Sequence, residues 1–270
     1  MKVAFIGGGN MATAIIGGLL AKGFRAGDIA VAEVDAQARA RLANTFGVST
    51  VEAPGSEVRH VDAIVMAVKP QQMRVAGQAL APHLGKQLVI TIAAGIRLAD
   101  LARWLGGHRR IVRAMPNTPA LVHAGVTGLY APEAVGEADR HAVEQLLQAV
   151  GTTVWFDREG DLDAVTAVSG SGPAYVFYAM EALEAGAREL GIAPEKARAL
   201  ALGTFVGAAK LAAGRAEDPA KLRAEATSPG GTTERALSVL EGAGVKAKFV
   251  EAVKAACERS RELGDEFGKD

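Results

Sequence analysis

Apolar and polar positions follow two different patterns along this chain, and the change falls at about Asp161. Before it, short runs rich in Val, Ile and Ala alternate with stretches of helical periodicity, which is typical of a parallel sheet covered by helices. The runs predict strands at Lys2–Ile6, Ile29–Ala32, Ala63–Val68, Leu88–Ala93 and Arg110–Met115, with Val126–Tyr130 and Thr152–Phe156 extending the sheet.

Beyond this point, apolar residues recur at spacings of three and four, as on one face of a helix. We therefore expect an α/β domain over residues 1–160 and an all-α domain over residues 161–270. So few helices bury their apolar stripes poorly alone, which predicts self-association through the C-terminal helices. The stripes are Val176, Met180, Leu183, Ala187 and Leu190; Leu202, Phe205, Ala209 and Ala212; and Phe249, Val253, Ala256, Leu263 and Phe267.

A glycine-rich turn follows the first predicted strand and opens a predicted helix. Its glycines allow a tight turn and a close approach of the backbone to a pyrophosphate, which then lies on the free amides of the helix N-terminus. The spacing Gly-x-Gly-x-x-Ala predicts a Rossmann-type dinucleotide site. Its cofactor-binding residues are Gly7, Gly8, Gly9, Asn10, Met11 and Ala12.

An acidic residue, Glu33, ends the second predicted strand. A carboxylate there binds the adenosine ribose hydroxyls and repels an added 2′-phosphate, so Glu33 favours NADH. Two alternatives stay open: Glu33 is merely solvated, or Arg39 or Arg41 meets a phosphate.

Unusual loops follow three further strands, at the carboxyl edge where ligands of open α/β sheets bind. We expect them to meet the nicotinamide end of the cofactor, although Pro and Asn are also common turn formers. The expected cofactor residues in these loops are Lys69, Pro70, Ala94, Gly95 and Asn117, the last in the sequence MPNTP.

Composition narrows the choice of partners. Thirty basic residues balance thirty acidic ones among 270, so no global field attracts nucleic acid or an anionic membrane surface. The single cysteine, Cys257, has no partner for a disulfide and no nearby His, so we expect no metal site and a reduced, cytoplasmic setting. No apolar stretch is long enough for a signal peptide or a membrane span.

The sequence SPGGTT, Ser228 to Thr233, interrupts the helical region. Pro and Gly exclude a helix interior, and TTERALSVLE after them is typical of a helix start. The amides of Gly231, Thr232 and Thr233 would then be unpaired and would point at an anion. The alternative is that Thr232 and Thr233 are only N-caps.

In its ordered motifs the chain resembles the pyrroline-5-carboxylate reductase family. The matching segments are FIGGGNMA, AVKPQ, AAG, RAMPNTPA, SGSGPAYV and SPGGTT followed by ERALSVLE. The resemblance implies an NAD(P)H-dependent enzyme that reduces 1-pyrroline-5-carboxylate to proline, with NADPH as the usual cofactor. It also implies a helical domain that interlocks with a second subunit, and in some members a ring of dimers.

The resemblance also assigns roles to residues. It implies that the nucleotide contacts Ala67, Val68, Lys69 and Pro70 as well as the glycine turn, and that the substrate lies against SPGGTT. Thr233 would then hydrogen-bond the ring nitrogen as the catalytic residue. The implied substrate-binding residues are Ser228, Gly230, Gly231, Thr232, Thr233 and Glu159.

The chain departs from the family in two places. It carries Glu225 where an amide or acidic pair often precedes the SPGG turn, and Glu33 where NADPH-using members have small polar or basic residues. Two rival functions remain. A β-hydroxyacid dehydrogenase needs a Lys on the long helix near Ser171 to Leu190, which has none. A dinucleotide sensor without turnover would have no need of SPGGTT.

Overall fold

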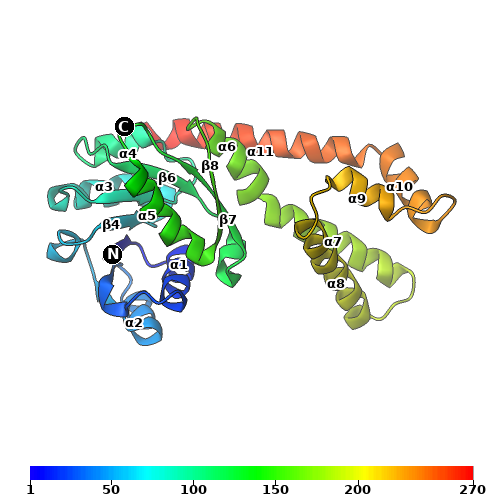
Figure 1. The fold of residues 1–270 in the computed structure, drawn as a ribbon, viewed down its shortest axis with the longest axis horizontal. Helices are drawn as coiled ribbons and strands as arrows, with labels where there is room; N and C mark the ends of the chain where they lie inside the picture. Colours follow the sequence, from blue (N-terminus) through cyan, green and yellow to red (C-terminus); the bar gives the residue numbers. More distant parts are fainter. Residues whose placement is uncertain (270) are drawn as a thin grey trace. The chain divides into compact units, whose positions relative to one another are not determined.

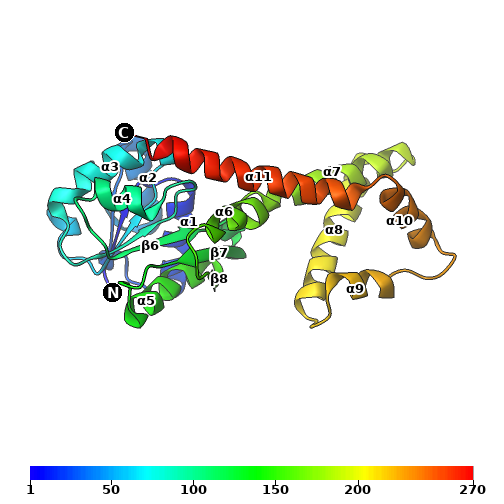
Figure 2. The ribbon, with the colours of Figure 1, turned by 90° about the horizontal axis from the view of Figure 1, so that it is seen from above.

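The computed structural model describes residues 1–269, which form two compact units (Figures 1 and 2). The sheet unit comprises Met1–Ser171 together with the C-terminal segment from Ala255, and the helical unit comprises Gly172–Lys254. The units have different bounds from the domains predicted at 160 and 161. Helical periodicity begins before the end of the sheet unit and the last helix returns to it, so the end of the β pattern does not mark the limit of the unit.

The sheet unit is built on one eight-stranded sheet in the order β3-β2-β1-β4-β5-β6-β7-β8. Neighbouring strands are parallel except β6 and β7, which are antiparallel. The predicted strands are all present, some of them shorter than expected, and β3 is an addition. The strands are β1 (Val3–Ile6), β2 (Ile29–Ala32), β3 (Ser49–Val51), β4 (Ala63–Met66), β5 (Leu88–Thr91), β6 (Ile111–Met115), β7 (Gly125–Tyr130) and β8 (Gly151–Trp155).

Helices cover both faces of this sheet, which is why the central strands β1, β4 and β5 are buried at every position and almost entirely apolar. Val3 and Phe5 of β1 pack in one core with α1, α2 and α5. Ala4 and Ile6 point to the other face and pack with α3, α4 and Phe267 of α11. These helices are α1 (Asn10–Ala21), α2 (Ala36–Phe46), α3 (Met73–Leu80), α4 (Leu98–Trp104), α5 (Glu137–Leu147), α6 (Asp161–Val165) and α11 (Val245–Phe267).

Short helical turns connect these elements. Among them, η7 is a π-helical turn that continues α6, and the N–H of Ser171 donates to the carbonyl of Thr166 at 2.8 Å. The turns are η1 (Ala26–Asp28), η2 (Ser56–Val58), η3 (Pro70–Gln72), η4 (Ala81–His83), η5 (Thr118–Val122), η6 (Gln148–Val150) and η7 (Thr166–Gly170).

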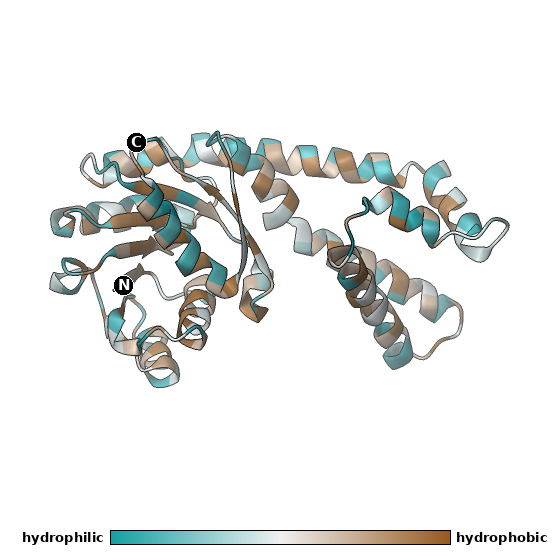
Figure 3. Cartoon of the chain, viewed as in Figure 1, coloured by the Kyte–Doolittle hydropathy of each residue, from teal (hydrophilic) through white to brown (hydrophobic). Residues whose placement is uncertain are grey.

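The helical unit has almost no core of its own within one chain. Of its described residues, only Ala197 and Ala201 are buried. Large apolar side chains on α7 and α8 are exposed, among them Phe177 at 62% and Leu183 at 50% exposure. Figure 3 shows the hydrophobic residues of these helices in brown. An apolar surface of this extent marks an interaction face. The helices of this unit are α7 (Gly172–Glu189), α8 (Pro194–Ala213), α9 (Pro219–Glu225), α10 (Thr232–Gly242) and the first part of α11.

None of the helices in residues 1–269 is both long enough and apolar enough to cross a membrane.

Candidate active site

The glycine turn after β1 has the close contacts that the sequence predicts. Gly7 has φ 98°, and a Cβ there would lie 2.8 Å from the carbonyl oxygen of Ala67. A Cβ on Gly8 would lie 2.5 Å from Cδ1 of Leu42, whereas one on Gly9 would meet nothing within 4 Å. The turn therefore packs tightly against the loop after β4 and against α2, and it opens toward solvent at Gly9.

Helix α1 begins directly at this turn with Gly9 as its N-cap. No side chain caps the helix, and its first turn carries no acidic residue. Within residues 1–269, no acceptor takes the N–H groups of Asn10, Met11 or Ala12. The N-terminal end of α1 therefore presents unpaired donors and a positive dipole end to an anion.

Glu33, at the end of β2, is held by two backbone amides. The N–H of Gly8 donates to its Oε2 at 2.7 Å, and the N–H of Asp35 donates to its Oε1 at 2.9 Å. The view of Glu33 as merely solvated is therefore wrong, because its carboxylate is fixed beside the glycine turn.

Asp35 caps α2, since its carboxylate accepts from the N–H groups of Gln37 and Ala38. The hydrogen bond from the Ala38 amide, followed by that from Gln37, lowers the pKa of this carboxyl. A protein carboxylate therefore accepts from the first-turn amides of α2, whereas no side chain accepts from those of α1.

The loop after β4 lies against the glycine turn. The N–H of Ala67 donates to the carbonyl of Ile6 at 2.7 Å, and the side chain of Val68 lies 3.0 Å from the Cβ position of Gly7. Lys69 is exposed, and Pro70 opens η3. The structure therefore brings Ala67 and Val68 together with Gly7, whereas their contact with a nucleotide stays a prediction.

Two other loop residues have contacts within the protein. Gly95 has φ 74°, and a Cβ there would lie 3.2 Å from Phe267 and 3.3 Å from Leu263 of α11. Asn117 donates to Oγ of Ser169 at 3.1 Å and accepts from the N–H of Val126 at 2.9 Å. Their cofactor role stays a prediction, as does that of the half-buried Ala94.

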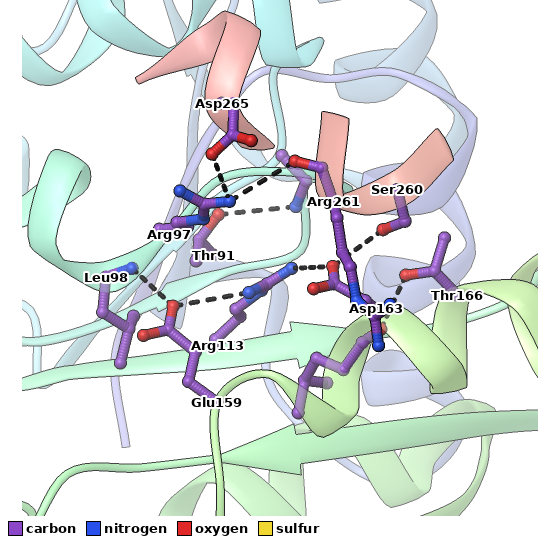
Figure 4. A network of polar contacts seen from close by, with 12 residues as sticks. Thr91, Arg97, Leu98, Arg113, Glu159, Asp163, Thr166, Ser260, Arg261 and Asp265 are labelled. Atoms are coloured by element: carbon purple, nitrogen blue, oxygen red, sulfur yellow. Dashed lines mark hydrogen bonds and ion pairs between the residues drawn. The ribbon is translucent and has the colours of Figure 1, made fainter. Parts of the chain in front are cut away.

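Glu159 is part of a buried polar network (Figure 4). Its Oε1 accepts from the N–H of Leu98 at 2.7 Å and lies 3.4 Å from Nη1 of Arg113. Nη2 of Arg113 lies 3.4 Å from Oδ1 of Asp163, which also accepts from Oγ of Ser260 at 2.8 Å. The network ties β6, α4, α6 and α11 together within the sheet unit.

The SPGGTT turn precedes α10 in the helical unit, and Gly230 has φ 72°, which favours glycine. The N–H of Gly231 donates to the carbonyl of Ser228 at 3.0 Å, so the prediction that this amide is unpaired is wrong. The N–H of Gly230 donates to Oε2 of Glu234 at 2.8 Å. The backbone of the turn thus closes on itself and on the first turn of α10.

The N-cap of α10 is Gly231, and no side chain caps the helix. The alternative in which Thr232 and Thr233 act as N-caps is therefore wrong, because they occupy the first two helical positions. Within residues 1–269, no acceptor takes their N–H groups, and both residues and Ser228 are exposed. This helix start leaves donors open to an anion, as the start of α1 does.

Glu225 lies just before this turn and accepts two hydrogen bonds from Arg215. Nη1 donates to Oε2 at 2.6 Å, and Nη2 donates to Oε1 at 3.2 Å. Its charge is therefore compensated within the helical unit.

Comparison with known proteins identifies the family. Residues 159–263 match the family model for pyrroline-5-carboxylate reductase dimerisation, and residues 2–95 match that for NADP oxidoreductase, coenzyme F420-dependent. The pyrroline-5-carboxylate reductase of Pseudomonas aeruginosa is 46% identical over 269 residues, covering 99% of this chain and 98% of that protein. This chain belongs to the pyrroline-5-carboxylate reductase family.

Solved structures agree with this assignment to the reductase family. A pyrroline-5-carboxylate reductase from Coxiella burnetii has a TM-score of 0.92 and 40% identity, covering 97% of this chain and 98% of that chain. The Plasmodium falciparum pyrroline carboxylate reductase, whose structure has NADP bound, has a TM-score of 0.87 and 29% identity over 98% of both chains. The predicted architecture is confirmed: an N-terminal, mainly parallel α/β NAD(P)-binding sheet is followed by a helical dimerisation domain.

Family membership gives the uncovered apolar faces of α7 and α8 a physical reason, because a dimerisation domain buries them against a second subunit. In residues 1–269, no group of three or more His, Cys, Asp or Glu side chains is placed to hold a metal ion. The features that sequence reasoning missed are the amide contacts of Glu33 and the buried network of Arg113. No local motif signals either of them.

Proposed function

We propose that this chain is a pyrroline-5-carboxylate reductase in its own right, reducing the C=N bond of 1-pyrroline-5-carboxylate to give L-proline, the last step of proline biosynthesis. The observation that carries the proposal is membership of the family over 99% of the chain. The starts of α1 and α10 support it, because each follows a glycine N-cap without a side-chain cap and the dinucleotide and the substrate are both anions.

The reaction makes modest demands on protein side chains. When bound, NAD(P)H would supply the hydride that reduces the imine carbon and would thereby be oxidised to NAD(P)⁺. The π electrons of the C=N bond settle on the ring nitrogen, which already carries its proton as the iminium. No strong general acid is required, in keeping with a SPGGTT turn that contains no His, Cys or Lys. The protein then contributes positioning and electrostatics.

The substrate carboxylate binds at the start of α10 in this proposal. The N–H groups of Thr232 and Thr233 are its donors, and Ser228, Gly230 and Gly231 shape the turn around it. The hydroxyl of Thr233 hydrogen-bonds the ring nitrogen. Glu159 is a weaker assignment for substrate binding, because Leu98 and Arg113 already engage its Oε1.

The dinucleotide binds at the glycine turn, with its pyrophosphate on the open amides of α1. Glu33 is held in place by Gly8 and Asp35 and keeps free lone pairs for the ribose hydroxyls. The fixed carboxylate repels a 2′-phosphate, which favours NADH over the NADPH that is usual in the family. Ala67 to Pro70, Ala94, Gly95 and Asn117 line the path to the nicotinamide.

The decisive experiment mixes the protein with 1-pyrroline-5-carboxylate and either NADH or NADPH and follows the loss of reduced-nicotinamide absorbance. We expect turnover with both and a higher kcat/KM with NADH. Absence of turnover with either cofactor would leave the dinucleotide sensor as the better description. Glu33→Ser should raise the kcat/KM ratio of NADPH to NADH, and an unchanged ratio would remove Glu33 from cofactor selection.

The role of Thr233 is tested by Thr233→Ala. We expect kcat to fall about tenfold, the equivalent of ~1.4 kcal/mol, because the contact orients the reacting ring. The control is Ser238→Ala on the same helix, whose hydroxyl donates to the carbonyl of Arg235 at 2.8 Å and lies away from the turn. Kinetics that match the control would show that the Thr233 hydroxyl is dispensable.

We propose that the assembly is a dimer formed through the helical units. Sedimentation at several protein concentrations distinguishes this dimer by mass from a ring of such dimers. We place the enzyme in the cytoplasm, in accord with its single cysteine, Cys257, and no disulfide within the chain. Fractionation of cells expressing a tagged full-length chain tests this placement.

A further inference from the structure

A cleft of about 390 Å³ opens in the sheet unit between α4, the start of β6 and the end of β7. Its volume lies within the usual range of small-molecule sites, about 300–1,000 Å³. Of the residues assigned above to cofactor or substrate, all within residues 1–269, only Glu159 lines the cleft. A ligand in this cleft would therefore be distinct from the dinucleotide and the imine.

The floor and one wall of the cleft are apolar. Tyr130 of β7 pairs with Arg113 of β6, so the side chains of Ile111, Arg113 and Tyr130 point to the same face of the sheet. Helix α4 is only seven residues long, and it presents small side chains to the cleft at Ala99 and Ala102. Ile111 and Tyr130 thus form an apolar floor, and the short side chains of α4 leave room beside it.

One end of the cleft carries the carboxylate of Glu159. Its Oε1 accepts from the N–H of Leu98 at 2.7 Å and lies 3.4 Å from Nη1 of Arg113. Figure 4 shows the second oxygen pointing away from Arg113, on the side of Leu98, which also lines the cleft. Within residues 1–269, no group donates a hydrogen bond to this Oε2. The carboxylate is therefore fixed in place and keeps one oxygen for an incoming donor.

The other charged groups of the cleft leave Glu159 as its fixed acceptor. Arg109 lies four residues before Arg113 in the chain, up to roughly 13 Å away along an extended backbone, and no ion pair joins it to Glu159 in the described structure. His108 is engaged by a backbone carbonyl, and the second acid, Glu133, is exposed to solvent. The cleft therefore has an acceptor at one end, a cation toward the other and apolar side chains between them.

We propose that this cleft binds a small primary amine with an apolar body. The ammonium group donates to Oε2 of Glu159 in a charge-assisted hydrogen bond, and the apolar body lies on Ile111 and Tyr130 beside Ala102. Arg109 disfavours a second ammonium group on the same ligand. The proposal does not rest on the reductase activity, and an amine without carboxylate or phosphate has no affinity for the anion sites at α1 and α10.

The test measures binding of two probes of the same shape to the full-length protein by ligand-observed NMR. Phenethylamine carries the ammonium group, and phenethyl alcohol replaces it with a neutral hydroxyl. Glu159→Gln removes the charge but keeps an oxygen for the N–H of Leu98, and Ala102→Leu fills the cleft. The matched control is Glu133→Gln, because Glu133 lines the same cleft but is exposed. Urea midpoints check that each variant is folded.

We expect the wild type to bind phenethylamine about tenfold more tightly than phenethyl alcohol. Glu159→Gln should abolish this preference, Ala102→Leu should weaken both probes, and Glu133→Gln should leave both unchanged. Saturating L-proline, the proposed product, should not displace phenethylamine. If Glu159→Gln lowers the urea midpoint, the two probes on the wild type and on Ala102→Leu still decide.

Four results would overturn the proposal. Equal binding of the two probes by the wild type would show that no carboxylate takes the ammonium group. Unchanged binding to Ala102→Leu would place the amine outside the cleft. Displacement by L-proline would place it in the substrate site. A loss in Glu133→Gln as large as that in Glu159→Gln would indicate general surface charge.

Discussion

Arg113 makes contacts whose removal has a large expected effect on stability. The residue is 3% exposed on β6, and its two Nη groups lie 3.4 Å from carboxylate oxygens of Glu159 and Asp163. Asp163 is itself only 8% exposed. Arg113→Met fills a similar volume with an apolar chain but leaves these carboxylates without their cation.

The expected loss in the free energy of unfolding depends on how deeply Arg113 and its carboxylate partners are buried, more than on the nitrogen–oxygen distances between them. Breaking a buried ion pair on one side costs about 3–5 kcal/mol, because an uncompensated charge stays in the interior. The contacts of Arg113 are long, and Asp163 keeps the hydrogen bond from Ser260, so we expect the lower end, ~3 kcal/mol. With a urea m-value of ~3 kcal/mol/M, the midpoint falls by about 1 M.

The assay is urea unfolding followed by circular dichroism at one fixed protomer concentration, since association contributes to apparent stability. Arg158→Met is the matched control: its Nη2 lies 2.6 Å from Oδ1 of Asp161, but the arginine side chain is 82% exposed. Although this contact is shorter, water screens it, and the control should unfold with the wild type. Arg113→Met combined with Asp163→Asn should recover part of the loss. The reasoning is refuted if Arg113→Met unfolds at the same urea concentration as Arg158→Met.

Three further changes have expected outcomes. Gly95→Ala should lower the free energy of unfolding measured in urea by about 1–2 kcal/mol, because an L-residue is strained at φ 74° and its Cβ would contact Phe267 closely. An unchanged urea midpoint would mean that α11 moves to accommodate the Cβ without loss of stability. If self-association covers the exposed apolar face of α7, Leu183→Glu should shift sedimentation toward the monomer, because it places a charge in that face, whereas Lys246→Glu on the exposed surface should not. The Asp35 carboxyl has a lower pKa in the folded protein than its ordinary value of 3.8, so its ionised form stabilises the fold above 3.8. This stabilisation is lost as the pH falls through the lower folded pKa. The difference in the free energy of unfolding between wild type and Asp35→Asn should therefore narrow in that acidic range and stay constant near neutral pH.

The centre of the sheet was predictable from sequence because β1, β4 and β5 are buried on both faces and appear as nearly unbroken apolar runs. β3 was missed for the converse reason: the sequence Ser49–Val51 is short, partly polar and not buried. The antiparallel pairing of β6 with β7 was missed because strand direction depends on the path of the connection rather than on composition.

Local motifs located the glycine turn and SPGGTT but did not give their partners. Gly7 and Gly8 were predictable because a strand, a tight turn and a helix follow one another in the sequence. The contact of Glu33 with Gly8 joins residues far apart in the chain, and the contact of Gly95 with Phe267 joins an early loop to the last helix. Neither leaves a periodic signal, so the structure is needed to show them. At Gly231, one hydrogen bond to Ser228 removes this amide from the predicted set of open amides, which leaves those of Thr232 and Thr233.

The helix starts differ in whether a side chain accepts hydrogen bonds from their first-turn amides. α2 and α9 are capped by carboxylates, those of Asp35 and Asp218, which occupy the first-turn amides. α1 and α10 have glycine at the N-cap, Gly9 and Gly231, and no side-chain cap. α5 and α6 share both features, but each carries two acidic residues in its first turn. A side-chain cap stabilises a helix by about 1 kcal/mol, so α1 and α10 are each less stable by about that amount than they would be with a cap. In the proposed function, the dinucleotide pyrophosphate and the substrate carboxylate are the anions that would complete these two caps. Stability of these two helix starts is then linked to ligand binding, because whatever binds the folded state alone stabilises it.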